Sequence, residues 1–160
     1  MATDAAFGQA AKFNSEVGFN LAVSDDKKAF TASFSGLEVV LEGKFAPPIA
    51  TRVFSFSIPL SGADPYKEIP FAVSGFVVSE KEANAHLVFS VNNQTTVMDF
   101  PANSNSSFIQ QLKYKPEDAA EARITVFLLA DRDSTSDSAV HVTVSTIDTD
   151  MAEAAIRKAS

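Results

Sequence analysis

An acidic loop near the C-terminal end of the chain contains the residues whose types and spacing most resemble a ligand site. Asp131, Asp133 and Asp137 are interleaved with serine and threonine in the pattern D-x-D-x-T-x-D. Carboxylate and hydroxyl oxygens suit Ca²⁺, which takes about six to eight oxygen ligands. The spacing therefore makes Ca²⁺ a candidate cofactor and these three aspartates its candidate ligands.

The EF-hand form of such a loop is excluded. It requires glycine at the sixth position and a bidentate glutamate at the twelfth, where this chain has Ser136 and Val142. A looser site remains open if Asp25 or Asp26 reaches the loop from another turn at the same end of the molecule. The alternative is a solvated loop that is kept soluble by its charge, with Arg132 pairing to a neighbouring aspartate.

The two histidines are the next candidates for chemistry. His86 and His141 both fall at outward positions of predicted strands. Two histidines cannot form a three-histidine zinc site, although histidine with carboxylates could bind zinc. The chain has no cysteine, no G-x-S-x-G elbow and no phosphate-binding glycine loop. We therefore expect a protein that is not an enzyme, and keep as an alternative a hydrolase whose serine or carboxylate site the sequence does not place.

The composition restricts the possible partners. The net charge is −7 and no basic run exceeds Lys27–Lys28, so a nucleic acid partner is not expected. Fourteen residues are phenylalanine, two are tyrosine and none is tryptophan, which favours aromatic rings in a core. Few tyrosines and no tryptophan argue against a glycosidase or an aromatic sugar platform, but leave a Ca²⁺-mediated lectin open.

The sequence contains no recognisable targeting or membrane segment. No apolar run approaches the roughly 20 residues that a spanning helix needs. The first residues lack a basic stretch followed by an apolar one, so no signal peptide is predicted in the sequence as given. The expected location is the cytoplasm, or the outside of the cell for an exported protein without its leader; the compartment stays open.

Hydrophobic alternation with period two dominates the chain. Nine or ten short strands, about ten residues apart, are separated by turns rich in glycine, proline, asparagine and serine. This spacing predicts an all-β fold, an antiparallel β-sandwich forming one domain over residues 1–160. Residues 1–14 are expected to be a loose lead-in. Residues 150–159 are expected to form a short helix, because Asp150 and Glu153 have capping-box spacing.

Four segments carry more specific predictions. Residues 71–78 and 124–129 are apolar on both faces, which predicts a central strand for 124–129 and, for 71–78, either a central strand or one under a covering loop. Residues 140–146 are apolar on one face, and we expect them to form a hairpin with 124–129 across the acidic loop. The strand Thr51–Leu60 is a candidate edge. Its interface residues would be Phe54, Phe56 and Ile58, unless nearby prolines guard that edge.

Together these features predict a non-enzymatic binding or structural module. It would bind a protein partner or associate with itself, making a homo-oligomer possible. One alternative is a Ca²⁺-dependent carbohydrate-binding domain using Asp131, Asp133 and Asp137. The other is the hydrolase described above.

Overall fold

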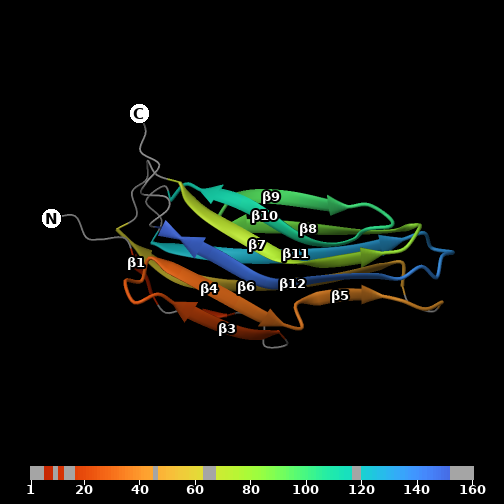
Figure 1. Cartoon of the computed structure of the whole chain (residues 1–160), viewed down its shortest axis with the longest axis horizontal. Coiled ribbons are helices and arrows are strands. Elements are labelled where there is room, and N and C mark those ends of the chain that lie inside the picture. Colours follow the sequence, from red (N-terminus) through yellow and green to blue (C-terminus); the bar gives the residue numbers. More distant parts are fainter. Residues whose placement is uncertain are drawn as a thin grey trace.

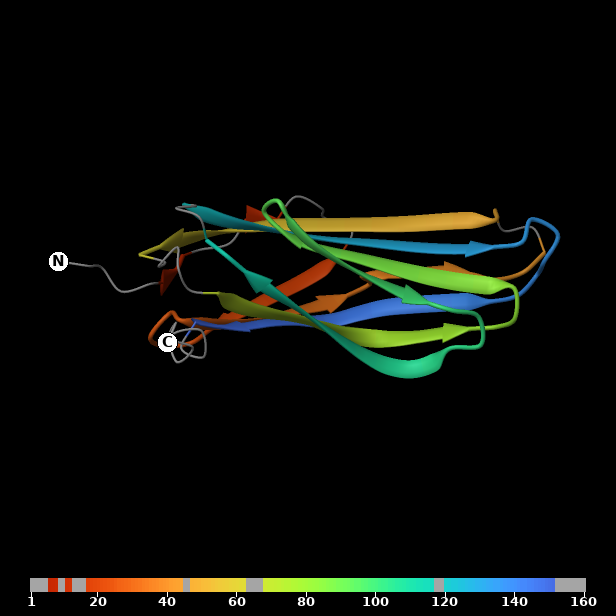
Figure 2. The same cartoon turned by 90° about the horizontal axis from the view of Figure 1, so that it is seen from above.

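The computed structural model describes residues 6–8, 11–12, 17–44, 47–62, 68–116 and 120–151. Over these residues the chain forms twelve β-strands, which pair antiparallel into two sheets. The sheets pack face to face as two layers (Figures 1 and 2). The predicted all-β antiparallel sandwich is confirmed.

The first sheet, called sheet I, has the strand order β1-β6-β11-β8-β9. Its strands are β1 (Ala6–Phe7), β6 (Ile49–Ser61), β11 (Glu121–Arg132), β8 (Ala83–Val91) and β9 (Gln94–Phe100), and β2 (Ala11–Lys12) also pairs with β6. Asn92 has a φ of 55° in the turn between β8 and β9, the backbone conformation that a two-residue hairpin turn requires.

The second sheet, called sheet II, has the strand order β10-β7-β12-β4-β3. Its strands are β10 (Asn105–Tyr114), β7 (Ile69–Ser79), β12 (Val140–Asp150), β4 (Ala29–Ser35) and β3 (Gly18–Val23), and β5 (Glu38–Leu41) also pairs with β12. Residues 71–78 lie in β7, which is flanked by β10 and β12, so the central position predicted for them is confirmed.

Phenylalanine rings fill the space between the sheets. Phe56 of sheet I contacts Phe30 of sheet II with ring centroids 6.1 Å apart, and Phe30 in turn contacts Phe71 at 6.2 Å. All three side chains are buried. Burial of one such side chain contributes about 1.5–3 kcal/mol, so this cluster holds the two layers together.

The chain termini depart from the sequence prediction. The lead-in is not loose throughout, because β1 and β2 pair with β6 and Phe7 is buried against Phe30 with centroids 4.9 Å apart. Asp150 is the last residue of β12, and Met151 directly after it is helical. Residues 152–159 of the predicted helix lie outside the described part of the chain.

The predicted hairpin between residues 124–129 and 140–146 is wrong. The first segment lies in β11, between β6 and β8 in sheet I, which confirms its central position. The second lies in β12, between β7 and β4 in sheet II. The acidic loop therefore passes from one sheet to the other. Each strand alternates as a strand must, and alternation alone does not say which sheet a strand joins.

The candidate edge strand is covered over part of its length. The side chains of Phe54, Phe56 and Ile58 are at most 1% exposed, so they pack in the core and offer no surface to a partner. β6 pairs with β11 on one side, and with β1 and β2 on the other side near its C-terminal end. Among the described residues, no strand pairs with residues 49–55 on that second side. Self-pairing there stays a prediction, and it would use backbone groups.

Within the described ranges there is no helix with the length and apolar character that crossing a membrane requires.

Candidate binding groove

The outer face of sheet II is hollowed into a groove of about 400 Å³. One row of side chains crosses its floor, with each residue in register with its neighbours on the adjacent strands: Ala22 of β3, Thr31 of β4, Asp148 of β12, Ala72 of β7 and Gln111 of β10. The groove is hollow because Ala22 and Ala72 occupy positions where larger side chains would stand above the sheet. Paired backbone under every position makes the floor rigid.

Hydroxyl groups hold the central carboxylate of the floor in place. Thr31 donates from Oγ1 to Oδ1 of Asp148 across 2.6 Å, and Thr146 donates to Oδ2 across 3.5 Å. The hydroxyl of Thr146 also lies 2.6 Å from that of Ser74 on β7. Asp148 is thus fixed as a hydrogen-bond acceptor that faces solvent beside further hydroxyls.

A β-bulge in β12 puts Asp148 on the outer face. The register of β12 against β7 shifts between Val144 and Thr146. Before the shift, Val142 and Val144 point into the core; after it, Ile147 does. Because side chains alternate between faces, an unshifted strand would have turned Ile147 to solvent and Asp148 into the core. The bulge therefore supplies both a buried Ile147 and an exposed Asp148.

Gly75 of β7 accommodates the backbone opposite this bulge. A Cβ atom at position 75 would lie 1.9 Å from the carbonyl oxygen of Thr143, closer than any side chain could tolerate. The glycine is needed for this close approach of two strands, as glycines inside strands often are.

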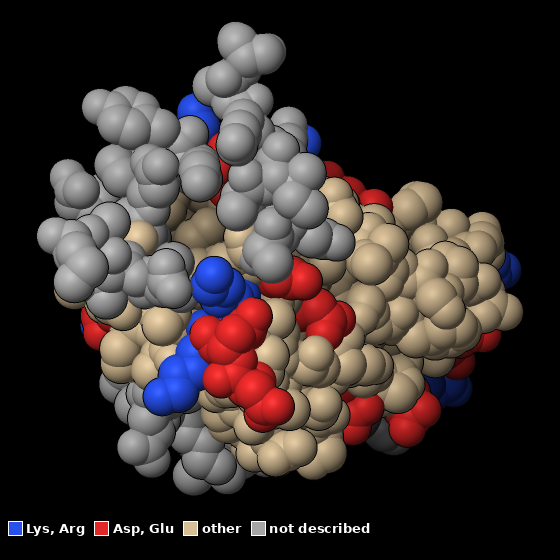
Figure 3. Space-filling model, turned by 60° about the vertical axis from the view of Figure 1, so that its left-hand side comes forward, with Lys and Arg blue, Asp and Glu red and all other residues tan. Residues whose placement is uncertain are grey.

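A charged turn closes the groove at the end of the sheet. Asp26 accepts hydrogen bonds from the hydroxyl of Ser24 at 2.6 Å and the backbone N–H of Lys28 at 3.0 Å. The bond from Ser24, followed by that from Lys28, lowers the pKa of the Asp26 carboxyl. Asp150 lines the groove on this side. Figure 3, which brings this end of the molecule forward, shows acidic side chains gathered in the middle of the view with basic ones beside them.

Apolar side chains continue the same face toward the other end of the strands. Phe76 is 43% exposed, and Val40, Val78 and Ile109 are exposed with it. Among the described aromatic residues, Phe76 alone is exposed. It lies four residues from Ala72 on β7, which is about 13 Å along the strand. The face therefore combines a polar, carboxylate-bearing floor with one open aromatic ring.

His86 lies on the outer face of the opposite sheet and does not line the groove. Its Nδ1 is 2.7 Å from Asp99 and its Nε2 is 3.1 Å from Asp131. A serine-hydrolase relay needs one ring nitrogen on a carboxylate and the other on the nucleophile. With both nitrogens on carboxylates, His86 does not have this arrangement.

His141 is on the outer face of sheet II, outside the groove. Its Nε2 lies 2.6 Å from Glu38 and 2.9 Å from the hydroxyl of Thr143. The carboxylate of Glu38 and the hydroxyl of Thr143 thus contact the same ring nitrogen, so His141 does not have the serine-hydrolase arrangement either. Both histidines do point outward, as the sequence predicted, but each is held by carboxylates rather than isolated.

The three aspartates of the candidate Ca²⁺ loop point to different neighbours. Asp131 bonds to His86 and, at 3.2 Å, to the amide of Asn84. Asp133 accepts from the N–H and hydroxyl of Thr135, both at 3.1 Å, and Asp137 is exposed. Nowhere in the described ranges do three carboxylate or histidine side chains form a group suited to a metal ion.

The buried side chain of Arg132 holds the acidic loop in this conformation. Arg132 is 6% exposed and donates to the carbonyls of Ser138 at 3.0 Å and Gly43 at 2.6 Å. The turn that carries Asp25 and Asp26 cannot supply further ligands to the acidic loop. This turn is bonded to Met151, just after the last residue of β12, whereas the acidic loop precedes the first residue of β12. Binding of Ca²⁺ by Asp131, Asp133 and Asp137 stays a prediction.

The floor of the groove was missed at the sequence level. The signal that could have found it is the phase change from Val140, Val142 and Val144 to Ile147, which marks a bulge and places Asp148 outward. Thr31 and Gln111 lie in strands that are far apart in the chain, and alternation alone does not predict the order of those strands in the sheet.

Comparison with known proteins finds fold-level likeness alone. Neither the family models nor the curated proteins contain a match. Among solved structures, the chain is similar to TmCBM61 in complex with β-1,4-galactotriose, at 8% identity and TM-score 0.38, covering 88% of this chain and 86% of that one. It is also similar to a family 29 carbohydrate-binding module from Piromyces equi, at 12% identity and TM-score 0.30, covering 91% of each chain. A CBM4 structure matches at 12% identity and TM-score 0.32, over 82% and 79%. Similarities this distant carry no argument about what the chain binds.

Proposed function

We propose that the protein is a non-enzymatic binding module that holds a neutral oligosaccharide along the outer face of sheet II. The observation that carries the proposal is the row Ala22, Thr31, Asp148, Ala72 and Gln111, which makes a preformed polar floor across five paired strands. Its volume of about 400 Å³ lies within the usual range of ligand sites.

The floor matches the chemistry of sugar hydroxyls. Asp148 can accept from a hydroxyl, and Gln111 can both donate and accept. Asp148 and Asp150 bring negative charge to the groove, which disfavours acidic polysaccharides and favours neutral ones. The exposed ring of Phe76 on the same face offers a flat apolar surface for the C–H face of a sugar.

Small and polar side chains also favour a sugar over the protein partner that the sequence suggested. Protein interfaces are anchored by large aromatic and arginine side chains in desolvated pockets. The groove floor contains alanine, threonine, aspartate and glutamine instead.

The arrangement of carboxylates supports binding without hydrolysis. A glycosidase places two carboxyl groups on opposite sides of the scissile bond. Asp148 and Asp150 instead lie two residues apart on the same strand, and both oxygens of Asp148 already accept threonine hydroxyls.

The test is a glycan array followed by calorimetry with the strongest binder. We expect neutral oligosaccharides to bind, and Ala72→Phe to weaken binding at least about tenfold because the new ring fills the floor. Glu42→Phe adds the same ring at an exposed position remote from the groove and should leave the affinity unchanged. Retention of full affinity in Ala72→Phe, or absence of any neutral glycan binder, would refute the site. Release of shortened sugars at steady state would refute the non-enzymatic role.

A further inference from the structure

The outer face of sheet I, on the opposite side of the molecule from the groove, carries an apolar row. Val53 of β6, Phe127 of β11, Val88 of β8 and Val97 of β9 are in register across four strands. Val53 and Val97 are 45% and 56% exposed, while Phe127 and Val88 are half-buried. The row exposes apolar surface in the middle of the face, and Ile49, which is 56% exposed beside Asp131, adds to it.

Rows made mostly of polar residues flank the apolar row on both sides. On one side lie hydroxyl-bearing residues: Ser55, Thr125, Ser90 and Thr95. On the other side lie Thr51, Leu129, His86 and Asp99. The two flanks thus differ in character, because one holds hydroxyls alone and the other includes a carboxylate and an imidazole.

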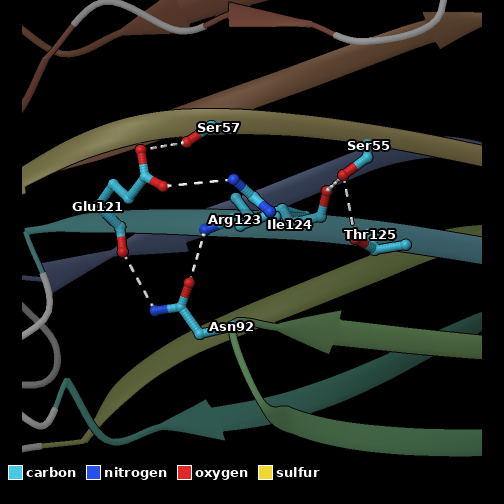
Figure 4. A network of polar contacts seen from close by, with 7 residues as sticks. All are labelled: Ser55, Ser57, Asn92, Glu121, Arg123, Ile124 and Thr125. Atoms are coloured by element: carbon cyan, nitrogen blue, oxygen red, sulfur yellow. Dashed lines mark hydrogen bonds and ion pairs between the residues drawn. The ribbon is translucent and has the colours of Figure 1, made fainter.

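Charge is distributed unevenly along the central strand of this face. Arg123 stands four residues before Phe127 on β11 and Asp131 four residues after it, both on the outer face. Figure 4 shows the end of the strand that carries Arg123, whose guanidinium lies 3.7 Å from the carboxylate of Glu121. Ser57 donates to the other oxygen of Glu121, and the side chain of Asn92 accepts from the backbone N–H of Arg123. The guanidinium remains 60% exposed there, so it can meet a further carboxylate.

We propose that this face binds a second copy of the chain, with the two-fold axis running along the apolar row. Such an axis lays β11 antiparallel over β11 of the second copy. Residues four positions either side of Phe127 then exchange places, so Arg123 faces Asp131 of the second copy. Two-fold symmetry repeats the contact, giving two opposite-charge pairs around an apolar centre.

The flanking rows are complementary under the same operation. Asp99 faces Thr95 of the second copy, pairing a carboxylate with a hydroxyl, and Thr51 faces Ser55 of the second copy. The side chain of Asp99 is 72% exposed and so is available for this contact. On β6, β8 and β9 a polar side chain thus meets one that can bond to it, while on β11 Leu129 faces Thr125 of the second copy.

The size of the face sets the strength of the dimer. Four strands about 4.8 Å apart and nine positions about 3.3 Å apart cover about 500 Å² for each copy. The total of about 1,000 Å² lies at the lower end for specific interfaces. The dimer is therefore expected to be weak and to form with rising concentration. It leaves both grooves on its outer sides, so two ligand sites would face away from each other.

Sedimentation velocity from about 1 to about 500 µM tests the dimer with a matched pair of variants. We expect the wild type to dimerise over this range. Val97→Lys, on the proposed interface, should remain monomeric. Ile109→Lys places the same charge at an exposed apolar position on sheet II and should dimerise like the wild type. A monomeric wild type overturns the proposal. Equal effects of the two variants, or a stronger effect of Ile109→Lys, overturn it as well.

The absence of cysteine from the chain allows a test of the arrangement. Val88→Cys lies on the proposed axis, where packed sheets are about 10 Å apart, so a short bis-maleimide should link two copies through it. Ile109→Cys should not be linked at the same concentration. Crosslinking of Ile109→Cys in preference to Val88→Cys would show that another face mediates association.

Discussion

The imidazole of His86 lies 3.1 Å from the carboxylate of Asp131 and joins β8 to β11 on the outer face of sheet I. Its other nitrogen lies 2.7 Å from Asp99, on β9. A doubly protonated ring donates to both carboxylates, whereas a neutral ring donates to one alone. The bond to Asp99 and, more weakly, that to Asp131 raise the pKa of His86 against an opposing effect of partial burial.

A raised pKa makes the contribution of His86 to stability dependent on pH. Because the folded protein binds the proton more tightly than the unfolded chain, the contribution is fully present below the ordinary histidine pKa. It is lost as the pH rises through the raised value. The side chains are about one-third exposed or more, so solvent screening limits the effect to at most about 1 kcal/mol.

Urea unfolding of the wild type and of His86→Gln between about pH 5 and pH 9 measures this effect. The stability difference between the two proteins should shrink as the pH rises. A difference that grows with pH would contradict the bridging role of the imidazolium.

A second prediction concerns Arg132, whose buried guanidinium bonds to the carbonyls of Ser138 and Gly43. Arg132→Met keeps the apolar stem but leaves those carbonyls without this donor. We expect a loss of about 2–3 kcal/mol in the free energy of unfolding, because hydrogen bonds to charged groups are the stronger ones. Lys81→Met removes a charge at an exposed site and should change stability by less than about 0.5 kcal/mol. Equal effects would show that the loop does not depend on Arg132.

The sequence predicted the layers of the fold better than their connections. Alternation identified most strands, and apolar residues on both faces of 71–78 and 124–129 correctly marked central strands. Alternation did not show that β11 and β12 belong to different sheets, because the same valines are buried whether the two strands pair with each other or with other strands. Phe7 was assigned to a loose segment since the strand that holds it has two residues, too few to show a period.

The candidate groove was harder to predict for a related reason. Its floor takes one residue from each of five strands that are distant in the chain, such as Ala22 and Gln111. No local pattern links these residues; strand order and register do. The composition of the acidic loop indicated a cation site, but the direction in which Asp131 points is set by the strand β11 that ends there.

A third prediction separates steric from conformational demands at two glycines. Gly75→Ala would place Cβ 1.9 Å from the backbone oxygen of Thr143, so β12 must move. We expect a loss of at least about 3 kcal/mol, or no folded protein. Gly43→Ala meets no atom within 4 Å but must adopt a φ of +84°, which costs about 1–2 kcal/mol. Thermal unfolding of both variants ranks them. A milder effect at Gly75 would mean that the bulge can relax.

The last prediction tests metal dependence. Asp131 bonds to His86 and Asn84 and Asp133 bonds to Thr135, so these carboxylates are held toward different neighbours, and in the described ranges no three carboxylate or histidine side chains form a group suited to a metal ion. The groove lies on the opposite sheet and uses Asp148, whose oxygens accept threonine hydroxyls. We therefore expect millimolar Ca²⁺ or EDTA to leave both the melting temperature and the glycan affinity unchanged. Thermal shift and calorimetry measure the two effects separately. A rise in melting temperature with Ca²⁺ that Asp133→Asn abolishes would instead establish the acidic loop as a calcium site, since a ligand that binds the folded state alone must stabilise it.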